Sequence, residues 1–207
     1  NYRELLDLDD KYSGYQKVAA NVIAMDGTNW FSSFTIDKGS KEGIKKGMNV
    51  IAGSGLVGIV TDVGPNFAKV RSIIDDSSNV SSMVLTTKDN FNVGGSLKSM
   101  NQDKVLPFTE LRDEDDKVKV GDPVVTSYVS DQYQEGILIG YIASIEKNAN
   151  NLTKSGTITP VVDFQHLREV LVITTLKDTG EKELSSQKAS DTQAETQDNT
   201  ETQKSQE

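Results

Sequence analysis

Residues 36–51 read Ile-Asp-Lys-Gly-Ser-Lys-Glu-Gly-Ile-Lys-Lys-Gly-Met-Asn-Val-Ile, and residues 55–60 read Gly-Leu-Val-Gly-Ile-Val. Short runs of apolar and β-branched residues are separated by glycines at turn spacing, which is typical of strands joined by tight turns. Gly39 belongs to a predicted turn, whereas Gly43 and Gly47 are expected to adopt positive φ angles or to allow close approach of the backbone. The stretch therefore predicts a small β-barrel.

The same pattern returns in the second half of the chain. A turn glycine precedes an apolar strand in both halves, first at Gly47 and then at Gly121. After a loop, each half continues with an apolar segment that begins at one glycine and contains another, namely Gly55 and Gly58, then Gly136 and Gly140. A glycine inside a strand usually marks a bulge or a bend at a barrel corner, so we expect such irregularities at Gly58 and Gly140. Two related β units in tandem are the simplest explanation, and chance similarity between glycine-rich strands is the alternative.

These patterns predict an all-β (mainly β) protein of two small barrels, with residues 13–98 in the first and residues 99–176 in the second. The apolar strand at residues 18–25 can complete either barrel, because the sequence does not show which strand it pairs with.

The two ends of the chain differ from this barrel region. Residues 1–12 carry apolar side chains at helical spacing, which predicts the end of an N-terminal helix or coiled coil. Residues 177–207 are predicted to form a disordered acidic tail. From residue 178 onward, eight acidic residues stand against three basic ones, and Leu184 is the only large apolar side chain. Such a segment cannot bury enough surface to offset the entropy of ordering it.

Several motifs in a fixed order resemble the MreC family of bacterial rod shape-determining proteins. They are Trp30 with the segment from Phe34 to Ile51, the segment Gly55–Val60, Val-Lys-Val-Gly-Asp-Pro-Val-Val-Thr-Ser at residues 118–127, and Val-Leu-Val-Ile at residues 170–173. The resemblance runs from about Val18 to Ile173 and implies barrels distantly similar to those of chymotrypsin-type proteases. The family pattern tends to have a glycine and a proline where this chain has Tyr128 and Gln134, so that loop is expected to differ in shape or in partner contacts.

The resemblance also implies a function. Members of this family are non-catalytic scaffolds of the cell-elongation machinery, which position and regulate peptidoglycan synthesis and so maintain cell shape. The implied partners are MreD, MreB, a class B penicillin-binding protein and further copies of the chain, as a homodimer or a larger assembly. The implied location is the extracytoplasmic side of the bacterial membrane, with a single-pass anchoring helix upstream of residue 1.

Composition is consistent with a binding protein. The net charge of −9 argues against nucleic-acid binding. The one basic cluster, at residues 38–46, is interrupted by Glu42 and is expected to be a solvated turn. Because the chain has no cysteine, it has no disulfide, thiolate metal site or cysteine nucleophile. The acidic segments 75–79 and 113–116 lack the spacing of a calcium loop and are expected to be solvated hairpin loops. We expect no metal and no cofactor.

Two other classes of protein are alternatives. A barrel-type serine protease, degenerate or active, requires His166 to meet a serine and an acid such as Asp163, yet no Gly-x-Ser-x-Gly motif is present. We therefore expect His166 to be an ordinary residue near a turn before the last strand. A secreted module that binds carbohydrate in the wall requires a row of exposed aromatic residues, and only 6% of the residues are aromatic.

Four aromatic residues are the candidates for a partner interface. Trp30 and Phe31 precede the first glycine motif, and alternation places Phe31 on the face opposite to Phe34 and Ile36, which are expected in the core. The loop from residue 127 to residue 134 carries the other two candidates, Tyr128 and Tyr133. No catalytic residue is predicted.

Overall fold

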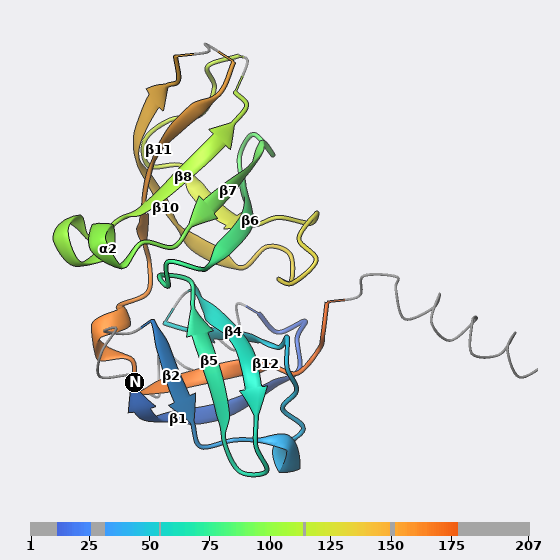
Figure 1. Cartoon of the computed structure of the whole chain (residues 1–207). Helices are drawn as coiled ribbons and strands as arrows, with labels where there is room; N and C mark the ends of the chain where they lie inside the picture. Colours follow the sequence, from blue (N-terminus) through green and yellow to red (C-terminus); the bar gives the residue numbers. More distant parts are fainter. Residues whose placement is uncertain (1–11, 26–31, 54, 114, 150–151, 178–207) are drawn as a thin grey trace, which may run out of the picture. The chain divides into compact units, whose positions relative to one another are not determined.

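The structure, a computed structural model, describes residues 12–25, 32–53, 55–113, 115–149 and 152–177. These residues form twelve strands and one α-helix, and the strands close into two barrels within one compact unit that ends at Lys177 (Figure 1). The predicted N-terminal helix at residues 1–12, apart from Tyr12, and the predicted tail beyond Lys177 lie outside the described residues.

The first barrel contains six strands, each hydrogen-bonded to two neighbours. Their order around the barrel is β1-β12-β3-β4-β5-β2, and all the pairs are antiparallel. The strands are β1 (Lys17–Met25), β2 (Ser33–Ile36), β3 (Asn49–Ala52), β4 (Gly55–Val63), β5 (Ala68–Ser72) and β12 (Glu169–Ile173). The strand at residues 18–25, whose partner the sequence left open, thus belongs to the first barrel and lies between β12 and β2.

The second barrel also contains six antiparallel strands, in the order β10-β11-β8-β7-β6-β9. They are β6 (Asn79–Val84), β7 (Asn90–Gly94), β8 (Leu106–Leu111), β9 (Pro123–Thr126), β10 (Leu138–Lys147) and β11 (Lys154–Pro160). A short helix, α2 (Leu97–Asp103), connects β7 to β8 and begins at the N-cap Ser96, whose hydroxyl accepts from the Ser99 N–H. Two 3₁₀ turns complete the description, at Ser40–Glu42 and Phe164–His166.

The predicted boundary between residues 98 and 99 is wrong on both sides. Strands β6 and β7 lie before that boundary, yet β6 pairs with β9 and β7 pairs with β8, which places both strands in the second barrel. Strand β12 lies after the boundary, yet it pairs with β1 and β3 of the first barrel. Apolar alternation reveals that a strand exists, but it does not reveal a partner more than a hundred residues away.

The two barrels share one cyclic order of strands, with a permutation. Strands β9, β10 and β11 follow one another around the second barrel as β3, β4 and β5 do around the first. In the second barrel, β6 lies beside β9. The equivalent strand in the first barrel is β12, which lies beside β3 and comes last in the sequence. The whole second barrel is therefore inserted between β5 and β12 of the first.

The predicted strand irregularities at Gly58 and Gly140 are confirmed. Pairing of β3 with β4 skips Val57, and pairing of β9 with β10 skips Ile139, so that a bulge stands directly before each glycine. A Cβ atom added at Gly58 would overlap the carbonyl oxygen of Arg71, and one added at Gly140 would overlap the carbonyl oxygen of Thr159. Both glycines are therefore required by close backbone approach.

The turn glycines of the two halves are equivalent as well. Gly47 has a φ of 88°, and its N–H donates to the Val60 carbonyl at 2.9 Å. Gly121 has a φ of 93°, and its N–H donates to the Ile142 carbonyl at 2.8 Å. Positive φ angles also occur at Gly43 and Gly136, whereas Gly39 and Gly55 have backbone atoms of other segments where a Cβ would stand. These matched turns and bulges support the interpretation of the chain as two related β units.

Candidate partner-binding surface

The loop between β9 and β10 presents two adjacent exposed side chains. Tyr128 is 55% exposed and Val129 is 58% exposed, although the loop around them is held by many hydrogen bonds. The Ser127 N–H donates to the Ser81 carbonyl at 2.9 Å, and the Ser130 hydroxyl accepts from the Tyr133 N–H at 3.0 Å. An apolar pair on an anchored loop loses little conformational entropy on binding, which is a property of good interface anchors.

Asn49 of β3 fixes the same loop to the first barrel. Its buried side-chain amide donates to the Gln132 carbonyl at 2.9 Å, and its amide oxygen accepts from the Gln134 N–H at 2.7 Å. The Gln134 side chain then donates to the Thr175 carbonyl at 2.9 Å. Gln134, one of the two departures from the family pattern, thus joins the loop to the segment that follows β12.

We expect Asn49→Ala to loosen this loop. The change leaves the Gln132 carbonyl and the Gln134 N–H without their partner, which costs about 1–3 kcal/mol when such groups are buried. Hydrogen exchange of the amides at residues 127–134 should accelerate while exchange in β10 and β11 stays slow. The control is Asn79→Ala, which removes an exposed amide at the start of β6. It should leave hydrogen exchange unchanged both in the loop and in β10 and β11. Equal protection of the loop in both variants would show that Asn49 does not hold it.

The structure separates the four predicted interface residues. Tyr128 is exposed, as a partner contact requires. Tyr133 is only 3% exposed, and burial raises the pKa of its hydroxyl to about 12, so the prediction that it belongs to an exposed surface is wrong. The turn at Ser130 directs Tyr133 into the core. Trp30 and Phe31 lie outside the described residues, while Phe34 and Ile36 are buried as predicted.

Sequence reasoning missed Val129 and Asn49. A local signal existed for both, because Val129 is an apolar residue in a polar turn and Asn49 is a polar residue inside an apolar strand. A buried amide in such a strand needs hydrogen-bond partners outside the ladder, and here the neighbouring barrel supplies them.

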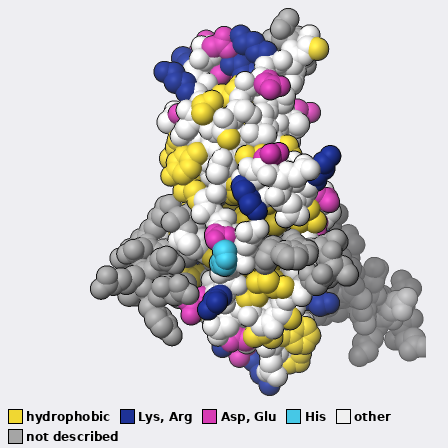
Figure 2. All heavy atoms as spheres, turned by 90° about the vertical axis from the view of Figure 1, so that its left-hand side faces the viewer, with side chains coloured by type: hydrophobic (Ala, Val, Ile, Leu, Met, Phe, Trp, Pro, Cys, Tyr) yellow, Lys and Arg dark blue, Asp and Glu magenta, His cyan; other side chains and the backbone are white. Residues whose placement is uncertain are grey.

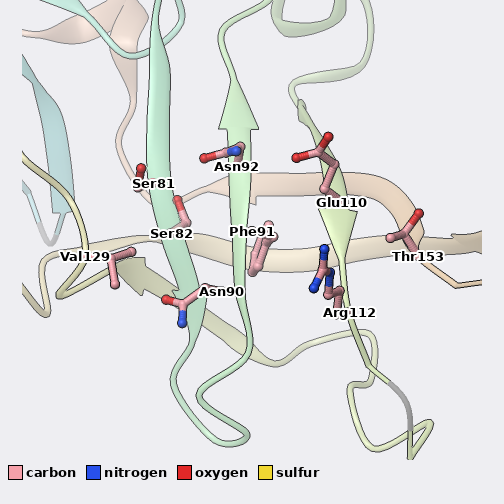
Figure 3. A pocket seen from close by; sticks show the side chains of 9 residues that line it. All are labelled: Ser81, Ser82, Asn90, Phe91, Asn92, Glu110, Arg112, Val129 and Thr153. Atoms are coloured by element: carbon pink, nitrogen blue, oxygen red, sulfur yellow. The ribbon is translucent and has the colours of Figure 1, made fainter.

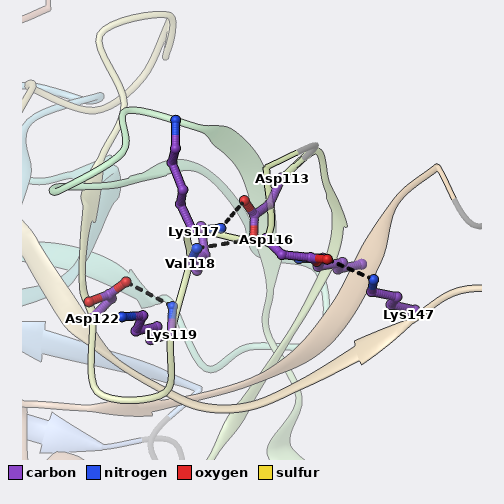
Figure 4. A network of polar contacts seen from close by, with 8 residues as sticks. Asp113, Asp116, Lys117, Val118, Lys119, Asp122 and Lys147 are labelled. Carbon is purple, nitrogen blue, oxygen red and sulfur yellow. Dashed lines mark hydrogen bonds and ion pairs between the residues drawn. The ribbon is translucent and has the colours of Figure 1, made fainter.

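The acidic segment 113–116 is a paired network as far as it is described (Figure 4). Asp115 and Asp116 are exposed, as expected of a solvated loop, but Asp113 is not. Asp113 is buried and accepts from the N–H groups of Lys117 and Val118 at 2.8 and 3.1 Å. The buried ammonium of Lys154 donates to Asp113 at 2.6 Å and also to Asp116. An ammonium thus stands between the two carboxylates, where a metal ion would have to bind, and the described residues contain no cluster of metal ligands.

The pKa values of this network follow from its contacts. Burial alone raises the pKa of the Asp113 carboxyl, but the bonds from Lys154, Lys117 and Val118 together hold that pKa below its ordinary value. Bonds from Lys154 and Lys147 lower the pKa of the Asp116 carboxyl to about 2. Both carboxylates are therefore ionised at neutral pH.

His166 does not complete a catalytic triad in the described residues. Its Nδ1 lies 2.6 Å from an oxygen of Asp163, the N-cap of the 3₁₀ turn that contains His166, and both side chains are exposed. The histidine is the cyan side chain on the surface in Figure 2. The hydrogen bond from His166 lowers the pKa of the Asp163 carboxyl. No serine hydroxyl in the described segments is hydrogen-bonded to His166, so this pair lacks the nucleophile that a serine protease requires.

No helix among the described residues has both the length and the apolar character needed to span a membrane.

Comparison with known proteins gives consistent matches. Residues 22–174 match the family described as rod shape-determining protein MreC, barrel core. The cell shape-determining protein MreC of Listeria monocytogenes is 34% identical over 173 residues, which cover 83% of this chain and 58% of that protein. The chain thus spans little more than half the length of this curated relative.

Solved structures agree with the sequence comparison. A structure of MreC from Listeria monocytogenes superposes with a TM-score of 0.70 at 32% identity, covering 86% of this chain and 88% of that one. A structure from Helicobacter pylori holds MreC in complex with the penicillin-binding protein PBP2. It superposes with a TM-score of 0.57 at 12% identity, covers 77% of this chain and 100% of that one, and shares the fold alone. Through its two barrels, this chain belongs to the MreC family of rod shape-determining proteins.

Proposed function

We propose that this chain is the extracytoplasmic barrel region of a non-catalytic scaffold that positions and regulates peptidoglycan synthesis during cell elongation. The observation that carries the proposal is the anchored loop with Tyr128 and Val129 exposed, on a chain of the MreC family. Its relatives are named for determining cell shape, and none of those names describes an enzyme.

The proposed partner is a class B penicillin-binding protein, with MreD, MreB and further copies of the chain in the same assembly. The complex of PBP2 with MreC from Helicobacter pylori supports the first of these partners. A scaffold of this kind acts by position. It shifts a synthase toward an active conformation by binding that conformation more tightly than the inactive one. A membrane anchor upstream of this chain would keep it beside the synthase.

We expect the double variant Tyr128→Ser/Val129→Ser to reduce capture of the synthase at least tenfold, because it removes the two apolar anchors of the surface. The measurement is mild crosslinking of the full-length, membrane-anchored protein in its own cells, followed by mass spectrometry. Val120→Ser is the control, since it removes an apolar side chain that is 64% exposed on a different turn of the second barrel.

Each outcome bears on a different part of the proposal. Capture of a penicillin-binding protein that the control preserves and the double variant loses would support the scaffold and this surface. If the double variant captures the penicillin-binding protein as well as the unchanged protein does, the scaffold function stands but Tyr128 and Val129 are not its binding surface. Capture of further copies alone would favour a self-assembling structural protein, and capture of cleaved substrates would return the protease hypothesis.

A further inference from the structure

The second barrel has one seam where the pairing of neighbouring strands is short. Strands β7 and β8 pair only through Asn92 with Thr109 and Val93 with Phe108. The next residue of β8, Glu110, has a φ of 63°, a conformation that residues other than glycine rarely adopt. The pairing of β8 with β11 also changes register at this point. The ladder therefore ends where Glu110 redirects the backbone, and rare conformations of this kind gather at binding sites.

A hollow of about 420 Å³ opens at this seam, within the size range of small-ligand sites. Figure 3 shows Glu110 on β8 and Arg112 just beyond the end of that strand, with Phe91 of β7 between the two segments. Beyond these three, the lining includes the polar residues Ser81, Asn90 and Asn92, and Val129 from the β9–β10 loop. The hollow therefore has an acid at the end of β8, a base directly after that strand, and two amides on β7.

Several of these polar side chains have no partner within the protein. In the part of the chain that the structure describes, the side chains of Glu110, Arg112 and Asn92 make no hydrogen bond or ion pair. Asn90, in contrast, is held by the Ser127 hydroxyl. An acid and a base two residues apart that do not pair with each other are both available to a ligand.

The charges of the lining indicate the chemistry of that ligand. A guanidinium recognises a carboxylate through two parallel hydrogen bonds, and a carboxylate recognises an ammonium. The Cα atoms of residues two positions apart on a chain are at most about 7 Å apart, so the two charged side chains leave the backbone within the length of a two-residue peptide. A neutral sugar fits less well, because the aromatic residue of the hollow, Phe91, is 5% exposed and offers no open face for stacking.

We propose that this hollow binds a short peptide with a free amine and a free carboxylate. Arg112 takes the carboxylate and Glu110 takes the amine. The hollow shares Val129 with the proposed partner surface, but this proposal does not depend on the scaffold function, because it requires a small ligand and no protein partner.

The test is a titration of the whole 207-residue chain with alanyl-alanine, followed by amide chemical shifts in NMR. We expect saturable shifts in β7 and β8, and at least tenfold weaker binding of the C-terminal amide and of the N-acetyl form, since each lacks one charge. Arg112→Gln should weaken binding of alanyl-alanine at least tenfold. It should leave binding of the C-terminal amide unchanged, because amidation of the ligand already removes the contact between its carboxylate and Arg112. Glu110→Gln should likewise weaken binding of alanyl-alanine at least tenfold and leave binding of the N-acetyl form unchanged.

Matched controls are Arg168→Gln and Glu146→Gln, which make the same chemical changes at exposed positions outside the hollow. Both controls should bind like the unchanged protein, and the spectra of all variants show directly whether they are folded. Three results would overturn the proposal: no saturable shift with alanyl-alanine, equal binding by Arg112→Gln and Arg168→Gln, or equally tight binding of N,N′-diacetylchitobiose in the hollow.

Discussion

Gly58→Ala is expected to destabilise the protein by about 3 kcal/mol or more, because the added methyl group would overlap the carbonyl oxygen of Arg71 on β5. That oxygen belongs to the backbone of a paired strand, so it cannot move aside as a flexible side chain would. The bulge at Val57 and the closure of the barrel both depend on this close approach. Urea unfolding of the variant and of the unchanged protein would measure the difference in the free energy of unfolding.

Two further variants give this prediction its controls. Gly140→Ala should destabilise to a similar extent, since Gly140 has the equivalent place in the second barrel and meets the carbonyl oxygen of Thr159. Gly14→Ala should change stability by less than about 0.5 kcal/mol, because nothing lies within 4 Å of the added methyl group. Equal stability of the Gly58→Ala and Gly14→Ala variants would mean that the strand can shift to admit a side chain.

Lys154→Met is the second large effect, with an expected loss of about 3–5 kcal/mol. The change removes the ammonium that pairs with Asp113 and leaves a carboxylate buried without its counter-charge. Methionine preserves most of the length of the side chain, so the loss measures charge and not packing. Lys147→Met, which removes the exposed partner of Asp116, is the control and should leave the free energy of unfolding nearly unchanged, because exposed ion pairs contribute little.

The effect should depend on pH in a defined direction. The pKa of Asp113 is lowered in the folded protein, so its stabilising contribution is present above the ordinary pKa of about 4 and is lost as pH falls through the folded value. The difference in unfolding free energy between the unchanged protein and Lys154→Met should therefore narrow from pH 7 toward pH 3. A constant difference across that range would indicate that Lys154 acts through packing alone.

The sequence predicted the local features of this fold well. A turn or a bulge is determined by residues within a few positions of it. The neighbouring residues therefore identified the turn glycines Gly47 and Gly121 and the bulge glycines Gly58 and Gly140. The fold class and the family follow from the same motifs. The exposure of Tyr128 was also predicted, because this residue lies in a loop between two clearly apolar strands.

Features that depend on distant partners were not predicted. Nothing near β12 indicates that it pairs with β1, which lies about 150 residues earlier, so the domain boundary was misplaced. Asp113 and Lys154 are 41 positions apart, and either residue alone is typical of a surface. Tyr133 differs from Tyr128 only through the turn at Ser130, and that turn determines which of the two side chains is buried.

The insertion of one barrel into the other determines the order in which the two can form during synthesis. All six strands of the second barrel leave the ribosome before residue 169, so that barrel can close while the first still lacks β12. Until then, β1 and β3 each have an unpaired edge, and such edges invite pairing with other chains. A nascent chain whose emerged part ends between residues 160 and 169 therefore carries one finished barrel and one open sheet, and the last five-residue strand then closes that sheet into the first barrel.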